Sequence, residues 1–180
     1  MDTLKEYRAV RGQCRDIFTA KVKDYGTSWR ILRPVSIVDQ LYIKAWRIRS
    51  IQEAGGVQKI EDSVEGEFMA IVNYGYIALI QLQLAENGHQ ELPLNEAERR
   101  YDELAQTIEE LMLRKNHDYG EAWRHMSEAS FVDLILTKLL RIRQIMGNDG
   151  KTLISEGIEA NIYDIVNYAL FALIQRQFSR

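Results

Sequence analysis

Cysteine, proline and histidine are scarce in this chain of 180 residues, which holds one cysteine, two prolines and three histidines. The single cysteine, Cys14, excludes an intramolecular disulfide, and the histidines have no ligand-like spacing to it or to one another, which argues against zinc. Long apolar runs are also missing, because the longest, such as residues 76–80, fall far short of the roughly 20 residues that a bilayer crossing requires. The formal net charge of -3 argues against general nucleic-acid binding, which depends on a cationic surface.

What remains is the composition of a folded domain, with 46% hydrophobic and 27% charged residues. A chain of this length can bury a core without a metal or a disulfide. The N-terminus has no cationic and then apolar leader, so we expect a cytoplasmic protein. No nucleophile elbow, phosphate-binding loop or Rossmann fingerprint is present.

The most informative feature is an internal repeat. A shift of 94 positions places KVKDYGTSWR on KNHDYGEAWR and IVNYGYIALIQLQ on IVNYALFALIQRQ without a gap. Across residues 21–84, roughly 26 of 64 positions are identical, which indicates a tandem duplication.

Each copy predicts three helices from its apolar periodicity. The expected spans are about residues 4–23, 36–55 and 62–85 in the first copy, and about 96–117, 130–147 and 155–178 in the second. The glycine of each DYG tripeptide is expected to end the first helix in the left-handed region. Side-chain caps are expected at Thr3, Asn95, Ser36 and Ser130, the last two in capping-box spacing with Asp39 and Asp133.

The predicted fold class is all-α, a six-helix bundle built from two tandem three-helix repeats related by a pseudo-twofold axis. We expect residues 1–87 to form the first repeat, 88–94 a linker and 95–180 the second repeat, within one compact fused domain.

Carboxylates gather on one side of the third helix of the second copy. At about 100° per residue, Glu156, Glu159, Tyr163, Asp164 and Asn167 lie within a stripe roughly 140° wide that continues into apolar residues. Inward carboxylates are costly unless compensated, and Mg²⁺ would compensate them. The alternative is ion pairing with the second helix, or solvation near a helix N-terminus.

The second helices carry a repeated basic pattern, Lys44 with Arg47 and Lys138 with Arg141. A lysine and an arginine three residues apart lie on one side of a helix, where they could hold the phosphates of a nucleotide. Equally, they could neutralise the facing carboxylates.

The turn motif K-x-x-D-Y-G-x-x-W-R occurs once in each copy. In the second copy it places Lys115, Asp118, Tyr119 and Trp123 beside a chain reversal, where aromatic rings could stack on a base while lysine and aspartate hold phosphate or ribose. The alternative is that the rings pack the turn against the bundle.

The segments KNHDYGEAWR, SFVDLILTKLLRIRQI and SEGIEANIYDIVNYALFALI resemble the all-helical nucleotide modification associated domain 1 family of bacteria and phages, over most of the chain and twice. The resemblance implies nucleotide-related work. The residues that match the family's acidic third-helix motif are Glu156, Glu159, Asp164, Asn167 and Tyr168. Ala160 departs from that motif, and Gly66 and Ala70 depart from it in the first copy, so a complete site is expected in the second copy, completed by Glu67.

The helical layout is also similar to the MazG-like all-α nucleoside triphosphate pyrophosphohydrolases, which bind Mg²⁺ through E-E-x-x-E on one helix and E-x-x-D on the next. The first of these motifs is absent here, since residues 133–138 supply only one acid and one base.

The leading hypothesis is therefore a Mg²⁺-dependent nucleotide phosphohydrolase or pyrophosphohydrolase that acts on a noncanonical or modified nucleotide. A non-catalytic nucleotide-binding or sensing module and a structural helical interaction protein are the alternatives. The expected catalytic residues are Glu159 and Asp164, the metal ligands Glu156, Glu159 and Asp164, and the substrate-binding residues Lys115, Asp118, Tyr119, Trp123, Lys138, Arg141 and Asn167. The expected partner is a nucleotide, with no membrane or nucleic acid, and a homodimer is left open.

Overall fold

A computed structural model describes residues 2–84, 89–151 and 157–179. Six α-helices account for most of these residues, and the described ranges contain no strand, which confirms the all-α prediction. The helices are α1 (Thr3–Tyr25), α2 (Pro34–Glu53), α3 (Val64–Gln83), α4 (Leu94–Tyr119), α5 (Glu128–Gly147) and α6 (Ile158–Phe178), with short 3₁₀ turns η1 (Ser28–Ile31) and η2 (Ala122–His125). Within the described part of the chain, no helix combines the length and the apolarity that a membrane crossing would require.

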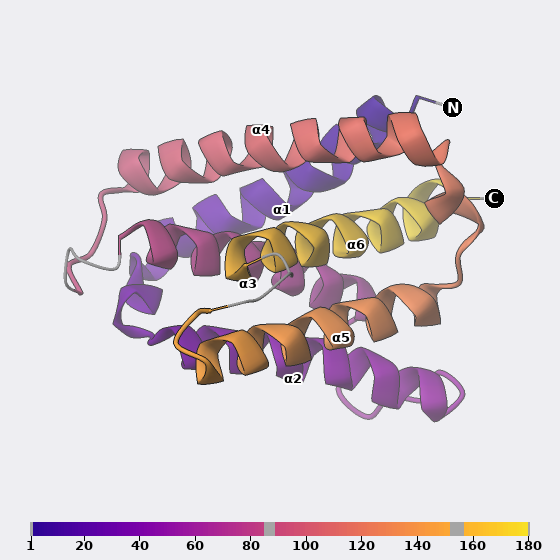
Figure 1. Ribbon diagram of the computed structural model, residues 1–180, viewed down its shortest axis with the longest axis horizontal. Helices are drawn as coiled ribbons and strands as arrows, with labels where there is room; N and C mark the ends of the chain where they lie inside the picture. The colour runs from indigo at the N-terminus through magenta and orange to yellow at the C-terminus, as the bar shows by residue number, and fades with distance from the viewer. Residues whose placement is uncertain (1, 85–88, 152–156, 180) are drawn as a thin grey trace.

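The helices form three layers, and each layer pairs the equivalent helices of the two repeats (Figure 1). Helices α3 and α6 lie in the middle, α2 and α5 cover one side, and α1 and α4 cover the other. The middle pair is therefore buried on both sides, which explains why α3 and α6 are apolar over nearly their whole length. This arrangement is the fused two-repeat bundle that the sequence predicts.

The expected caps of the second helices are wrong by about one turn. Helix α2 begins at Pro34, whose fixed backbone angle suits the first position of a helix, and α5 is capped by Ser127, whose side chain accepts a hydrogen bond from the Ser130 N–H. Ser36 therefore lies inside the first turn of α2, as Ser130 does in α5.

The first helices also start earlier than expected. Asp2 caps α1 by accepting a hydrogen bond from the Lys5 N–H, which places Thr3 inside the helix. Helix α4 follows Pro93 without a side-chain cap, which places Asn95 inside it as well.

Asp39 and Asp133, expected as helix caps, instead join the two repeats. Asp39 accepts a hydrogen bond from Arg143 at 2.8 Å, and Asp133 pairs with Arg49 at 3.4 Å. The two ion pairs are related by the 94-residue shift, so each links α2 to α5 in the same way. All four side chains are at least one-third exposed, so the pairs orient the layer more than they stabilise it.

Buried hydrogen bonds join the repeats across the middle layer. The Tyr7 hydroxyl donates to Asn167 Oδ1 at 2.8 Å, and the Tyr101 hydroxyl donates to Asn73 Oδ1 at 2.9 Å. Both tyrosines are fully buried, and both asparagines are less than a tenth exposed. Each repeat therefore supplies a donor to the other, as expected for two copies folded around a pseudo-twofold axis.

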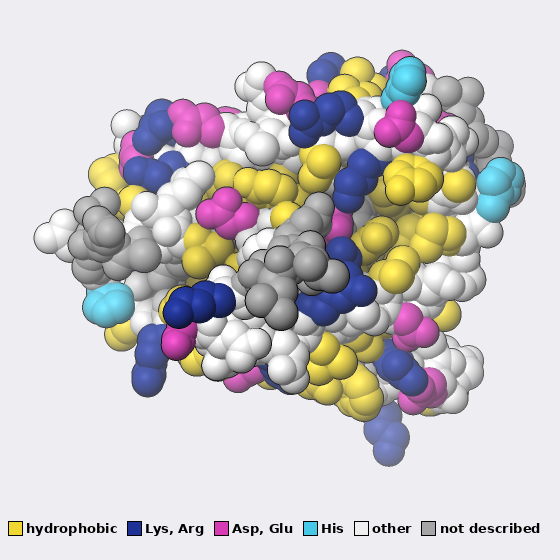
Figure 2. Space-filling view, in the orientation of Figure 1, with side chains coloured by type: hydrophobic (Ala, Val, Ile, Leu, Met, Phe, Trp, Pro, Cys, Tyr) yellow, Lys and Arg dark blue, Asp and Glu magenta, His cyan; other side chains and the backbone are white. Residues whose placement is uncertain are grey.

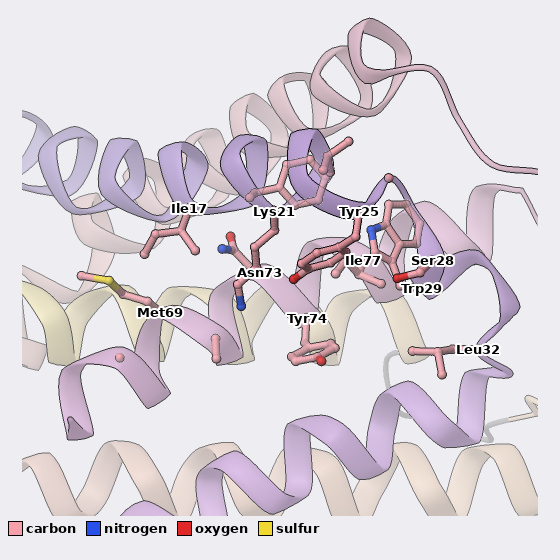
Figure 3. A pocket seen from close by; sticks show the side chains of 15 residues that line it. Ile17, Lys21, Tyr25, Ser28, Trp29, Leu32, Met69, Asn73, Tyr74 and Ile77 are labelled. Carbon is pink, nitrogen blue, oxygen red and sulfur yellow. The ribbon is translucent and has the colours of Figure 1, made fainter. Parts of the chain in front are cut away.

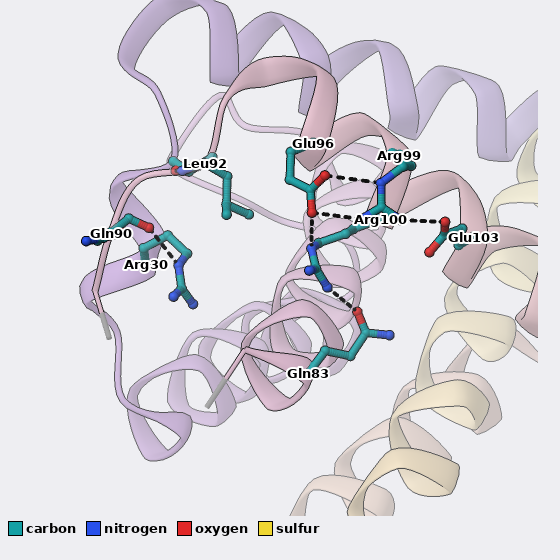
Figure 4. Close-up of polar contacts among 9 residues, drawn as sticks. Arg30, Gln83, Gln90, Leu92, Glu96, Arg99, Arg100 and Glu103 are labelled. Atoms are coloured by element: carbon teal, nitrogen blue, oxygen red, sulfur yellow. Dashed lines mark hydrogen bonds and ion pairs between the residues drawn. The ribbon is translucent and has the colours of Figure 1, made fainter. Parts of the chain in front are cut away.

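The segment that leads into α4 is attached to the first repeat. The buried Thr27 hydroxyl accepts a hydrogen bond from the Leu92 N–H at 2.8 Å. Arg30 Nε donates to the Gln90 carbonyl at 3.0 Å (Figure 4). The turn after α1 thus holds the start of the second repeat in place.

Helix α6 lies close against Gly75 of α3, which gives a stability prediction. A Cβ atom at this position would lie 2.6 Å from Val166 Cγ2, so Gly75→Ala should lower the free energy of unfolding by about 1–3 kcal/mol despite the better helix propensity of alanine. Gly12, in the middle of α1, has nothing within 4 Å of the same added atom. Gly12→Ala should therefore stabilise the chain by about 0.5–1 kcal/mol. Urea unfolding curves would decide, and a gain at Gly75 equal to that at Gly12 would contradict the close approach.

Candidate functional site

Asp164 of α6 lies between two lysines from different helices. Lys115 Nζ, near the end of α4, is 2.5 Å from Asp164 Oδ1, and Lys138 Nζ, from the middle of α5, is 2.8 Å from Asp164 Oδ2. The carboxylate therefore faces one ammonium group at each oxygen. The structure brings together three residues that the sequence selected for one site, and we refer to Lys115, Lys138 and Asp164 as the charged cluster.

The charged cluster carries more positive than negative charge. The Asp164 side chain is 7% exposed and that of Lys138 is 13% exposed, whereas Lys115 is 45% exposed and open to solvent. Arg141 lies one turn after Lys138 and has no hydrogen bond or ion pair within the part of the chain that the structure describes. Figure 2 shows lysine and arginine side chains gathered on the face over α5 and α6.

The pKa of the Tyr168 hydroxyl depends on the charges of the charged cluster and of Arg141. Burial raises the pKa of its hydroxyl, Asp164 raises it further, and the positive charges of Lys115 and Arg141 lower it. Tyr119 also raises the pKa of this hydroxyl slightly. Arg141 and Tyr119 are therefore near enough to Tyr168 to affect its pKa, as Asp164 and Lys115 of the charged cluster are.

Trp123 packs in the core of the bundle. Its ring is 6% exposed and stacks on Phe171, with 4.2 Å between ring centroids, and the Arg124 guanidinium lies 4.5 Å from the ring centroid. The indole N–H donates to Asn116 Oδ1 at 3.1 Å. This is the packing alternative for the turn motif, because a base that stacked on Trp123 would have to displace a neighbour.

Asn167 is buried, whereas Asp118 is exposed to solvent. Both polar atoms of the Asn167 amide have protein partners, since Oδ1 accepts from Tyr7 and Nδ2 contacts the Ile108 carbonyl at 3.5 Å. Asp118 is 77% exposed and contacts only its neighbour His117, at 3.1 Å. The substrate-binding roles expected for Asn167 and Asp118 stay predictions.

The expected magnesium ligands are not brought together among the described residues. Glu159, in the first turn of α6, is exposed, whereas Asp164 is buried and paired with lysines. Glu156 lies outside the described residues. No group of three or more histidine, cysteine, aspartate or glutamate side chains in the described ranges could hold a metal ion. Each oxygen of Asp164 faces an ammonium group, and the magnesium ligation stays a prediction.

Two glutamines that the sequence analysis missed hold the turns of the site. Gln175 Nε2 donates to the carbonyls of Trp123 and Met126 at 3.0 and 2.9 Å. Gln81 does the same in the first repeat, at the carbonyls of Trp29 and Leu32. The signal was available, because the two glutamines are identical at the 94-residue shift within an otherwise apolar helix.

The first repeat arranges its charges differently. Lys44, the counterpart of Lys138, lies 3.6 Å from Glu67, and Arg47 lies 3.0 Å from the same carboxylate oxygen. Ala70 stands at the position of Asp164. Glu67 thus serves its own repeat and does not complete the site of the second.

Comparison with known proteins gives one match. The family model described as nucleotide modification associated domain 1 matches residues 21–82 and again residues 115–176, more than half of the chain. Both matched ranges run from the turn motif to the third helix of a repeat, and the second contains all of the charged cluster. No curated protein and no solved structure matches the chain.

Proposed function

The chain belongs to the nucleotide modification associated domain 1 family, and on that premise we propose that it binds a nucleotide through the charged cluster of its second repeat. In this proposal Lys115, Lys138 and Arg141 contact the phosphates. The observation that carries the proposal is that two lysines from different helices face one buried carboxylate, with Arg141 one turn from Lys138.

Asp164 has a defined part in this proposal. Without a ligand, its carboxylate keeps the ammonium groups of Lys115 and Lys138 close together, which their mutual repulsion would otherwise oppose. When phosphate oxygens arrive, they share these ammonium groups with Asp164. Charge-assisted hydrogen bonds to phosphate are among the stronger polar contacts, so the gain offsets the weakened ion pairs.

Arg141 and the two tyrosines extend the proposed site. Arg141 presents a planar fork that suits a phosphate group, and its exposure leaves it accessible. Tyr119 is 72% exposed, so its ring can lie against a base without unpacking the bundle. Affinity should increase with the number of phosphates, because each added phosphate can reach another cation.

Hydrolysis with Mg²⁺ stays a prediction. The described residues do not assemble a metal site. Phosphate binding requires only the cations Lys115, Lys138 and Arg141, whereas hydrolysis would also require the metal.

The test removes one charge of the charged cluster at a time. Lys138→Met removes a phosphate contact and should weaken nucleoside triphosphate binding by at least about ten-fold. Asp164→Asn removes the competing carboxylate and also the charge that holds the two ammonium groups together, so these effects oppose each other and the affinity should stay within about ten-fold of that of the unaltered chain. Isothermal titration with ATP, GTP, CTP and UTP, with and without Mg²⁺, measures both effects.

Matched controls come from the repeat itself. Lys44→Met changes the counterpart of Lys138, and Asp133→Asn neutralises an exposed aspartate on α5, so both should bind like the unaltered chain. Loss of binding in Asp164→Asn would instead indicate a metal-bridged nucleotide. Unchanged affinity in Lys138→Met, or no binding by the unaltered chain, would refute the proposal.

A further inference from the structure

The first repeat contains a cavity of about 250 Å³ between the end of α1, the turn η1 and the first half of α3. Figure 3 shows Lys21 extending from α1 into this space, with Tyr25, Trp29 and Tyr74 around it. We refer to this space as the first-repeat cavity. It lies outside the charged cluster, to which it contributes no residue.

In the first-repeat cavity, a small residue stands at the position that an acid holds in the charged cluster. The 94-residue shift places Lys21 on Lys115 and Ala70 on Asp164, and both Lys21 and Ala70 line the cavity. Gly66, also in the lining, stands where the second repeat has the larger Ala160. The first repeat thus has the lysine, but a methyl group stands at the position of the carboxylate.

Lys21 has no acidic partner among the described residues. It makes no ion pair and no hydrogen bond with any residue in the described ranges. Lys44 does not compensate for the missing acid, because it is directed to Glu67. Asn73, which also lines the cavity, has both amide atoms bonded to protein groups, so Lys21 is the group in the lining that can recognise charge.

We propose that the first-repeat cavity binds a small molecule that has a flat ring and one anionic group. The anion occupies the place of the missing carboxylate, against Lys21, and the ring packs among Tyr25, Trp29 and Tyr74. The single cation limits the ligand to one anionic group, whereas the charged cluster offers several cations. The two repeats therefore bind different ligands.

The size and polarity of the cavity define the ligand class further. Its volume lies just below the roughly 300–1,000 Å³ of typical ligand pockets, which suits one ring system with a short substituent and excludes a dinucleotide. Tyr25 is 56% exposed at the rim, so a ligand can enter without a change in the bundle. The shared chemistry fits a nucleoside monophosphate or an aromatic carboxylate, and the experiment separates these sources.

Fluorine NMR of the full chain labelled with 5-fluorotryptophan gives a site-resolved test. The chain has three tryptophans, of which Trp29 lines the cavity, Trp123 is its counterpart in the second repeat and Trp46 lies on α2. The probes are the four common nucleoside 5′-monophosphates, their uncharged nucleosides, and indole-3-carboxylate. At least one charged probe should shift the Trp29 signal and leave Trp123 and Trp46 in place, and its class identifies the source of the anion.

Three variants connect the signal to the proposed chemistry. Lys21→Met should weaken the effective probe by about ten- to a hundred-fold, because it removes a charge-assisted contact and keeps the apolar stem. Ala70→Asp restores the intrachain acid and should abolish binding, while Lys23→Met, on the same helix but outside the lining, should change nothing.

The results expected for the first-repeat cavity can be distinguished from those expected for the charged cluster. No Trp29 shift with any charged probe, or an unchanged affinity in Ala70→Asp, overturns this inference and leaves the triphosphate proposal standing. Equal binding of the uncharged nucleosides also overturns it, because the anion would then contribute nothing. Conversely, a Trp29 response that survives Lys138→Met shows a site independent of the charged cluster.

Discussion

Replacing Asn73 and Asn167 with alanine should lower the free energy of unfolding by about 1–3 kcal/mol at each site, because each change leaves a fully buried tyrosine hydroxyl without an acceptor. Burial raises the pKa of Tyr7 and Tyr101 well above its usual value, so both hydroxyls are proton donors at neutral pH. Two such losses are a large part of the 5–15 kcal/mol by which a domain is typically stable.

A nearby tyrosine provides the matched control. The Tyr76 hydroxyl is buried but has no hydrogen-bond partner among the described residues, although its ring stacks on Tyr101 at 4.0 Å between centroids. Tyr76→Phe should therefore be neutral or stabilising, whereas Tyr7→Phe should destabilise by leaving Asn167 Oδ1 unpaired. Urea unfolding of these variants measures the difference, and equal effects of the two tyrosine changes would contradict the link between the repeats.

The Cys14 thiol should react at least about a thousand-fold more slowly in the folded chain than in the unfolded chain. Burial raises its pKa from 9.0 to about 12, which lowers the thiolate fraction by about three orders of magnitude near neutral pH. The side chain is also fully buried on the face of α1 that packs on the middle layer. Alkylation followed by mass spectrometry, with and without concentrated guanidinium chloride, gives the two rates.

The alkylation rate of Cys14 also tests the role of Asn73. Asn73 Nδ2 donates to the Cys14 carbonyl at 2.9 Å, so Asn73→Ala should loosen α1 and raise the alkylation rate in native conditions. Rapid labelling of the unaltered folded chain would contradict the packing of α1 described above.

The fold could be predicted from the sequence because its signals are periodic and occur twice. The 94-residue repeat, the apolar third helices and the glycines of the DYG turns predict six helices. Gly120 has the left-handed conformation expected at the helix end, whereas Gly26 has a φ of 69° with a ψ of -158°, outside that region. The capping boxes were wrong because serine and aspartate three residues apart also suit a position inside the first turn. Asp39 and Asp133 lie in the second turn of α2 and α5 and pair with arginines of the opposite repeat, which local spacing does not reveal.

The candidate site was predicted only in part, for a geometric reason. Glu159 and Asp164 lie at opposite edges of the helical stripe. Glu159 is exposed to solvent, whereas Asp164 faces the lysines of α4 and α5. A helical projection places residues on a face but does not say which neighbour covers each edge. The ion-pairing alternative describes what surrounds Asp164, since Lys138 and Lys115 take both of its oxygens.

The first-repeat cavity could not be found from sequence signals for chemistry, because it arises from residues that are missing. Ala70 and Gly66 were interpreted as losses from an acidic motif. In three dimensions the same two small residues line a cavity together with Lys21.

The most direct test of the account is a thermal-shift screen of the purified chain against nucleoside mono-, di- and triphosphates, each with and without Mg²⁺. A ligand at 100 times its Kd adds about 2.7 kcal/mol to the stability of the folded state, which is a readable rise in Tm. Binding through the cations of the charged cluster predicts a rise that grows from mono- to triphosphate and is already present without metal. No rise with any nucleotide, or a rise only when Mg²⁺ is present, would contradict it.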